Sequence, residues 1–180
     1  MTTYELLLIG GGAGVGKTTV AWEVSAALRA AGTAHCLIEG DYMDQIHPAP
    51  ADDPHRAAIT ERNTAAIWAN YAALGQRRLI YTNTVSILEE PMLRRAMGGG
   101  AIRSTCVLLT AEEATVRERL AGREIGSQLD AHIERSLRMA RELNERAPAG
   151  TVRIPTDGRG VEDIALDVVR TVAWKDQATG

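Results

Sequence analysis

The chain has 180 residues, a length that suits one domain with a sizeable buried core. Its 20 basic and 23 acidic residues give a net charge of −3 without any basic run, so nucleic acid is not an expected partner. The first residues lack the charged and apolar regions of a secretory signal, and no apolar run reaches membrane-spanning length. We therefore expect a cytoplasmic protein that has no membrane contact and is a monomer or a homodimer.

Apolar runs of strand length alternate along the chain with segments of helical periodicity. The strand-like runs lie at about 4–10, 34–39, 78–84, 103–109 and 151–155. The helix-like segments lie at about 17–31, 56–75, 88–97, 111–123, 128–146 and 160–174. This alternation requires crossover connections and predicts a parallel sheet that is covered on both faces. We expect a single α/β domain over 1–180, a three-layer α/β/α sandwich with about five parallel strands.

The most informative motif follows the first apolar run, from Tyr4 to Ile9. It reads Gly11, Gly12, Ala13, Gly14, Val15, Gly16, Lys17, Thr18, and Thr19 comes next. A strand that leads through a Gly-rich turn into a helix directs backbone N–H groups and the helix dipole at one spot, which favours phosphate. Lys17 can reach the β- and γ-phosphates, and the Thr18 hydroxyl can take a Mg²⁺ position. Only one other residue, Lys175, is a lysine in this Arg-rich chain, which favours a specific need for a compact charge here.

Two further strand ends bear on the chemistry. The second strand runs into Gly40-Asp41, which directs a carboxylate to the same sheet edge as the loop. We expect Asp41 to hold a metal-bound water or to accept a proton from an attacking hydroxyl. Asp44, three residues later, is a weaker candidate for the same role. The third strand ends in Thr82-Asn83-Thr84, without the acid that usually orients Mg²⁺. Either a neutral hydroxyl holds the metal's water while Asp41 supplies charge, or nucleotide and Thr18 hold Mg²⁺.

Arginines near the fifth helix-like segment are candidates for stabilising transferred phosphate. Arg119 and Arg123 are four residues apart and share a face if the helix continues. Phosphoryl transfer spreads negative charge over equatorial oxygens, which a positioned arginine stabilises. The arginine segment extends over about 117–130. A set on the next helix, His132, Arg135 and Arg138, is expected to form a solvated face.

Other residues are expected to be structural. Cys36 and Cys106 each lie in an apolar run, which predicts buried, reduced thiols. A helical spacing predicts that Ile67, Trp68, Tyr71 and Leu74 belong to the core. The three prolines between His47 and His55 exclude a continuous helix. That stretch is either a surface loop or a substrate-facing flap.

Taken in order, these motifs resemble the P-loop small-molecule kinases, which include adenylate, shikimate and gluconate kinases and chloramphenicol phosphotransferase. The resemblance rests on the loop, the strand-2 Gly-Asp, Arg119-x-x-x-Arg123 and a final Ile-Pro-Thr-Asp-Gly. It implies that Arg119 lies against adenine or phosphates and that Arg123 binds the transferred phosphoryl group in a closing lid. It also implies that a loop formed by Thr156, Asp157 and Gly158 lies beside the adenine.

The resemblance does not extend to the acceptor. Ile38-Glu39-Gly40-Asp41 with His47-Pro48 is similar to a gluconate kinase stretch, although the spacing is longer. The chain lacks a nucleoside-monophosphate site and a shikimate-type Arg-Pro lid motif. We expect an ATP- and Mg²⁺-dependent phosphotransferase that acts on a hydroxyl or phosphate of a small metabolite. The alternatives are a P-loop NTPase or nucleotide switch without an acceptor, and a module that binds nucleotide without turnover.

Overall fold

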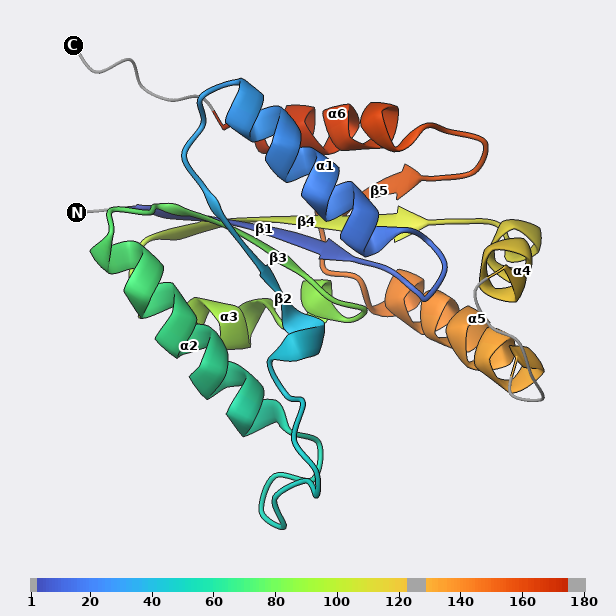
Figure 1. Ribbon diagram of the computed structural model, residues 1–180, viewed down its shortest axis with the longest axis horizontal. Helices are drawn as coiled ribbons and strands as arrows, with labels where there is room; N and C mark the ends of the chain where they lie inside the picture. Colours follow the sequence, from blue (N-terminus) through green and yellow to red (C-terminus); the bar gives the residue numbers. More distant parts are fainter. Residues whose placement is uncertain (1–2, 123–128, 175–180) are drawn as a thin grey trace.

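The structure is a computed structural model that describes residues 3–122 and 129–174 (Figure 1). In this part of the chain the strands are β1 (Tyr4–Gly10), β2 (Cys36–Glu39), β3 (Arg78–Thr82), β4 (Ile102–Thr110) and β5 (Val152–Pro155). The helices are α1 (Lys17–Ala30), α2 (Ala57–Ala73), α3 (Glu90–Ala96), α4 (Glu113–Ala121), α5 (Leu129–Arg146) and α6 (Val161–Val172). Two short 3₁₀ turns, η1 (Gly40–Tyr42) and η2 (Ser86–Leu88), follow β2 and precede α3.

The five strands form one parallel sheet in the order β2-β3-β1-β4-β5. Helices α1 and α6 lie on one face of the sheet, and α2, α3 and α5 lie on the other (Figure 1). The expected three-layer α/β/α sandwich with five parallel strands is therefore confirmed. Because β1 lies between β3 and β4, the loop after β1 starts at the point where the chain's connections diverge to the two halves of the sheet.

The central strand supplies both halves of the core. Leu7 and Ile9 are fully buried against the α1 and α6 side, whereas Leu6 and Leu8 are fully buried on the other side. This alternation follows from the period of two in a strand, and burial on both faces explains the continuous apolar run. On the α2 side, the rings of Tyr4 and Trp68 meet edge to face with centroids 5.1 Å apart.

Some element boundaries and burial assignments differ from the sequence expectations. Leu74 is 81 % exposed, so its assignment to the core is wrong. Helix α2 ends at Ala73, and Leu74 is the residue at its C-terminal cap. The expected third strand ends at Thr82 rather than at 84. The helix expected at 88–97 begins only at Glu90, because Pro91 at its first turn suits a helix start.

The two cysteines are free thiols on the sheet. Cys36 and Cys106 are partly buried rather than fully buried, and neither forms a disulfide. Burial raises the pKa of Cys36 to about 12 and that of Cys106 to about 11. Both thiols are therefore protonated at neutral pH and weakly nucleophilic. No helix in the ranges 3–122 and 129–174 is long and apolar enough to cross a membrane.

Gly11 allows the loop after β1 to pass close to β4. Its φ of +151° disfavours other residues, and a Cβ there would lie 2.7 Å from the Leu109 carbonyl oxygen and 2.8 Å from Val15 Cγ2. The Gly11 amide donates a hydrogen bond of 3.1 Å to the Thr84 carbonyl oxygen, which ties the loop to the end of β3. The loop's path therefore depends on the absence of a side chain at this position.

We predict that Gly11→Ala lowers the free energy of unfolding by about 2–4 kcal/mol, because it adds steric overlap to backbone strain. The matched control is Gly150→Ala, where φ is +85° but no atom lies within 4 Å of the added Cβ. That control should cost only about 1 kcal/mol. Urea denaturation measures both variants, and equal destabilisation would contradict the role assigned to close packing.

Candidate functional site

The sequence-predicted phosphate loop forms one wall of a cavity at the carboxyl edge of the sheet. The cavity has a volume of about 310 Å³. The residues that line it come from the loop and α1, from the ends of β2 and β3, and from α4 and α5; they are Ala13, Gly14, Gly16, Lys17, Thr18, Thr19, Asp41, Thr84, Leu120 and His132. Residues from distant parts of the sequence therefore meet at one concave site, which is the usual shape of a ligand site.

The amino end of α1 makes this cavity favourable for an anion. Gly16 is the N-cap residue, in a left-handed conformation with φ 93°, and no side chain caps the helix. The first turn of α1 carries no acidic residue. The N–H groups of the first turn and the positive end of the helix dipole are therefore directed at the site, as phosphate binding requires. The Lys17 ammonium lies across the loop and donates to the Gly12 carbonyl oxygen at 3.2 Å.

Asp41 lies in the same cavity as Lys17 and Thr18, on the turn η1 that ends β2. Gln45 holds this turn by donating to the Asp41 carbonyl oxygen at 2.6 Å, and Asn63 of α2 donates to the Met43 carbonyl oxygen at 2.7 Å. The Asp41 side chain is exposed and forms no ion pair with the described residues. Asp44 does not line this cavity. The geometry thus brings Asp41, but not Asp44, to the phosphate loop.

The polar residues at the end of β3 have different roles: Thr82 and Asn83 form structural hydrogen bonds, whereas Thr84 lines the cavity. Thr82 is buried and donates to the Ile9 carbonyl oxygen at 3.1 Å, which links β3 to β1. Asn83 turns toward η2 and donates to Glu89 Oε2 at 2.8 Å. Thr84 lines the cavity. Among the described residues, no group of three or more His, Cys, Asp or Glu side chains is arranged to hold a metal ion.

Arg119 binds the back of the phosphate loop. Its Nη1 donates to the carbonyl oxygens of Gly14 at 3.2 Å and Val15 at 3.5 Å, and to Thr156 Oγ1 at 3.0 Å. Its Nη2 donates to the Thr156 carbonyl oxygen at 3.0 Å. One planar guanidinium therefore joins the loop to the segment after β5, a task for which arginine's fixed fork is suited. Arg123 lies outside the described residues.

Two hollows continue from Arg119 away from the phosphate cavity. One has a volume of about 280 Å³ and lies between the loop and α6; its lining includes Val15, Arg119, Thr156 and Arg159. The other is an open hollow lined by Thr115, Glu118, Arg119, Gly122 and Gly158. Arg119 therefore lies between the phosphate cavity and two hollows in which a base could bind.

Asp157 has a structural contact that the sequence did not reveal. Its Oδ1 accepts a hydrogen bond of 2.8 Å from the Glu112 amide at the start of α4. Desolvation acts to raise the pKa of Asp157, but hydrogen bonds from the Glu112 amide and the Thr115 hydroxyl outweigh it and hold the pKa below its usual value. Thr156 is 1 % exposed, and its hydroxyl donates to the Thr110 carbonyl oxygen at 3.2 Å. This loop therefore ties β4 and α4 to β5.

Helix α5 approaches the loop from the other side. The Ser136 hydroxyl donates to the Ala13 carbonyl oxygen at 2.9 Å, and His132, one turn earlier, lines the phosphate cavity. Arg135 and Arg138 are exposed, as expected for a solvated face, whereas His132 is not part of that face. The four-residue spacing of His132, Ser136 and Ala140 could have indicated a separate, small and polar face toward the loop.

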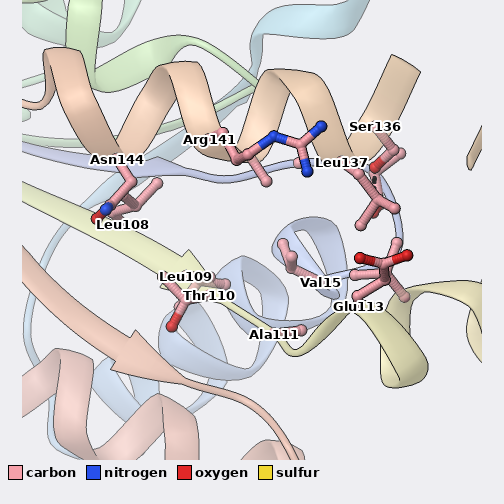
Figure 2. Close-up of a pocket in the computed structure, with 14 residues that line it drawn as sticks. Val15, Leu108, Leu109, Thr110, Ala111, Glu113, Ser136, Leu137, Arg141 and Asn144 are labelled. Carbon is pink, nitrogen blue, oxygen red and sulfur yellow. Dashed lines mark hydrogen bonds between the residues drawn. The ribbon is translucent and has the colours of Figure 1, made fainter. Parts of the chain in front are cut away.

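A second cavity of about 250 Å³ lies behind the loop, between the end of β4 and α5 (Figure 2). Its walls are mainly apolar and include Leu108, Leu109, Val116 and Leu137, with Arg141 extending from α5 and Glu113 from α4. Gly12 and Ala13 border it, but Lys17, Thr18 and Asp41 do not. This apolar cavity is therefore separate from the phosphate cavity and from the hollows beside Arg119.

Sequence comparisons return no relative: no protein-family model matches the chain, and no curated protein matches it. Similar solved structures include an APS kinase from Mycobacterium tuberculosis in complex with AMPPNP and APS, at 18 % identity and TM-score 0.61, with 97 % of this chain and 100 % of that one covered. This chain has the fold of the P-loop small-molecule kinases.

Two further kinase-fold structures extend the comparison. A Deinococcus radiodurans tunicamycin resistance protein matches at 18 % identity and TM-score 0.61, covering 96 % of this chain and 97 % of that chain. A gluconokinase from Sinorhizobium meliloti 1021 matches at 16 % identity and TM-score 0.59, covering 96 % and 94 %. These matches span nearly the whole chain, as the resemblance in sequence motifs predicted, and their low identities establish the fold alone.

We predict that Arg119→Ala weakens ATP binding about tenfold or more and lowers the free energy of unfolding by about 1–3 kcal/mol, because charge-assisted hydrogen bonds to the loop are lost. The control is Arg117→Ala, whose exposed side chain pairs with Glu113 at 2.7 Å and Glu134 at 2.9 Å. That control should change stability by less than about 1 kcal/mol. Calorimetric ATP titration and urea denaturation measure both variants, and equal effects would contradict the assigned role of Arg119.

Proposed function

We propose that the protein is an ATP-dependent phosphotransferase that acts on a small-molecule acceptor. The observation that carries this proposal is the single cavity in which Lys17 and Thr18 of the phosphate loop meet Asp41 from β2. A site that only bound nucleotide would not need an exposed, unpaired carboxylate beside the position of the terminal phosphate. Kinases of this fold, such as the APS kinase bound to AMPPNP, supply a supporting analogy.

The nucleotide follows the loop from the phosphate cavity toward α6. The loop from Gly11 to Gly16, with Lys17, Thr18 and Thr19, holds the phosphates through backbone N–H groups and the Lys17 ammonium. The base and ribose occupy the hollows beside Arg119, where Thr156 and Gly158 contribute to the walls. In this arrangement Asp157 supports the base-side loop through its hydrogen bond to the Glu112 amide.

The residues at the cavity fit a Mg²⁺ ion that is shared with nucleotide. Mg²⁺ usually takes one or two protein oxygens and completes its shell with phosphate oxygens and water. Thr18 and Asp41 would hold it, and Thr84 lines the same cavity, in support of the neutral-hydroxyl alternative. When bound, Mg²⁺ neutralises charge on the β- and γ-phosphate oxygens.

In the transfer step Asp41 orients the acceptor and takes its hydroxyl proton. The acceptor oxygen forms a bond to the γ-phosphorus, the bond to the β,γ-bridging oxygen breaks, and ADP leaves. Arg119 stabilises the bound nucleotide, and Arg123 neutralises charge that develops during transfer. We propose a single domain over 1–180 with a lid at about 117–130, of which residues 117–122 and 129–130 are described. Its two free thiols suit the reducing cytoplasm.

The direct test is ATP consumption with and without a panel of small acceptors, with phosphorus NMR to locate the transferred phosphate. Lys17→Ala should abolish turnover while the unfolding free energy stays within about 0.5 kcal/mol, because the side chain buries little apolar area. Phosphate that appears only as inorganic phosphate, without stimulation by any acceptor, would favour an NTPase or nucleotide switch. Unchanged ATP affinity and rate in Lys17→Ala would contradict nucleotide binding at the loop.

We predict that Asp41→Asn lowers the rate of phosphoryl transfer about 10²-fold or more, since it keeps the side chain's size but removes the base. ATP binding should weaken far less. The control is Asp163→Asn, an exposed carboxylate on α6 that lines none of the cavities described above. Single-turnover kinetics and calorimetry separate the two effects. A wild-type transfer rate in Asp41→Asn would contradict the role of Asp41 in transfer and would leave it only a role in the turn after β2.

A further inference from the structure

The apolar cavity behind the phosphate loop is a space that the proposed transfer reaction does not use. Its volume is about 250 Å³, and its walls include Leu108, Leu109 and Val116, each at most 2 % exposed. Protein interiors contain few voids larger than a water molecule, because an apolar void forfeits packing contacts. An apolar cavity of about 150 Å³ is enough to hold a benzene molecule. The apolar cavity is therefore large enough for an organic ligand of about one ring with a short side chain.

Charged side chains mark the place where this cavity opens to solvent. Arg141 of α5 and Glu113 of α4 both line the cavity and are exposed, and Figure 2 shows both side chains near Leu137. Glu113 is engaged by Arg117, which donates to its Oε1 through Nε at 2.9 Å and Nη2 at 2.7 Å. Arg141 has no ion pair or hydrogen bond within residues 3–122 and 129–174. The charge that this opening offers to a ligand is therefore positive.

A second donor lies on the same face of α5. Asn144 follows Arg141 by three residues and lines the cavity beside Leu108 (Figure 2). Its Oδ1 accepts a hydrogen bond of 2.7 Å from Arg153 Nε, so its Nδ2 group remains a donor. Arg153 also donates to the Asn144 carbonyl oxygen at 3.0 Å, which holds this end of α5 against β5. Arg141 and Asn144 thus both offer donors, which favours a ligand that carries hydrogen-bond acceptors.

The position of Arg141 distinguishes it from two other arginines of the same helix. Arg135 and Arg138 are exposed and line none of the cavities described above. Arg141 comes directly after Ala140 and one turn after Leu137, and both of these residues line the apolar cavity. An arginine at the rim of an apolar cavity can pair with the charged end of a ligand whose apolar part is buried. Arg138 provides a matched control for this role.

We propose that the apolar cavity binds a small carboxylic acid whose apolar body is about the size of one ring. The body packs against the leucine and valine walls, and the carboxylate pairs with Arg141. A single cation, with the Glu113 carboxylate close by, disfavours a doubly charged phosphate group. Lys17, Thr18 and Asp41 do not line this cavity, so the ligand is neither the nucleotide nor the phosphoryl acceptor of the proposed function.

The test compares ligands that share an apolar body and differ in charge. One series is 3-phenylpropionate, 3-phenylpropanamide and 3-phenylpropylamine, and the other is hexanoate, hexanamide and hexylamine. Acetate serves as an anion without an apolar body. Calorimetry with the full chain should give a Kd of about 1 mM or lower for at least one of the two acids. That acid should bind about threefold or more tightly than its amide, and the amine and acetate should bind most weakly.

Backbone amide chemical shifts of the isotope-labelled protein locate the bound acid. We expect the largest changes at residues 108–111 and 137–144, which contribute the end of β4 and the α5 wall of the cavity. Changes centred on Lys17, Thr18 and Asp41 would place the acid in the phosphate cavity and would overturn the proposal.

A pair of variants tests the charge that the carboxylate meets. Arg141→Gln should weaken binding of the acid about threefold to tenfold and leave binding of the amide unchanged, because only the charged ligand loses a partner. Arg138→Gln removes an equally exposed charge from the same helix and should leave both affinities unchanged. Urea denaturation verifies that each variant folds.

Four results overturn the proposal. They are binding by neither acid, an affinity of acetate, amide or amine that equals or exceeds that of the acid, an unchanged acid affinity in Arg141→Gln, and an equal loss in Arg138→Gln. No nucleotide is present in these titrations, so none of these results decides whether the protein transfers phosphate. That question is answered separately by ATP consumption with the acceptor panel.

Discussion

The site depends on one constraint, the uncapped amino end of α1. Gly16 takes the N-cap position in a left-handed conformation and offers no side chain to the first turn. The N–H groups there cannot be satisfied within the helix, so they are available to an anion. Other contacts serve to hold this end in place: the Gly11 amide bonds to Thr84, Ser136 bonds to Ala13, and Arg119 bonds to Gly14 and Val15. The phosphate loop is thus fixed from three sides of the sheet edge before any ligand arrives.

The sequence predicted the features that depend on local pattern. The apolar run of β1, the glycine-rich turn and the amphipathic α1 specify the loop without tertiary information, and the alternation of strands and helices specifies the layers. The expected position of Asp41 follows from the fact that the carboxyl ends of parallel strands share an edge, and Asp41 lines the same cavity as Lys17 and Thr18. Leu74 was misplaced since periodicity does not show that α2 ends one residue earlier.

The features of the site that the sequence did not predict depend on contacts between segments that are distant in the chain. Glu89 lies after β3 and has no motif, yet its side chain accepts a hydrogen bond of 2.8 Å from Asn83 at the end of β3. Arg119 was expected at a ligand, but its contacts with loop carbonyls also give it a structural role. Asp157 accepts a hydrogen bond from the Glu112 amide just before α4, across 45 residues of sequence. None of these pairings has a spacing that local periodicity could detect. The expected role of Arg123 stays a prediction, because Arg123 lies outside the described residues.

The central claim is that nucleotide phosphates bind between the loop and Asp41. The most direct measurement is the change in backbone amide chemical shifts when AMPPNP and Mg²⁺ are titrated into the isotope-labelled protein. The account predicts the largest changes from Gly12 to Thr19, with further changes at Asp41, Arg119 and Thr156. Changes concentrated instead at Leu108 to Ala111 and Ser136 to Asn144, around the apolar cavity of Figure 2, would contradict it.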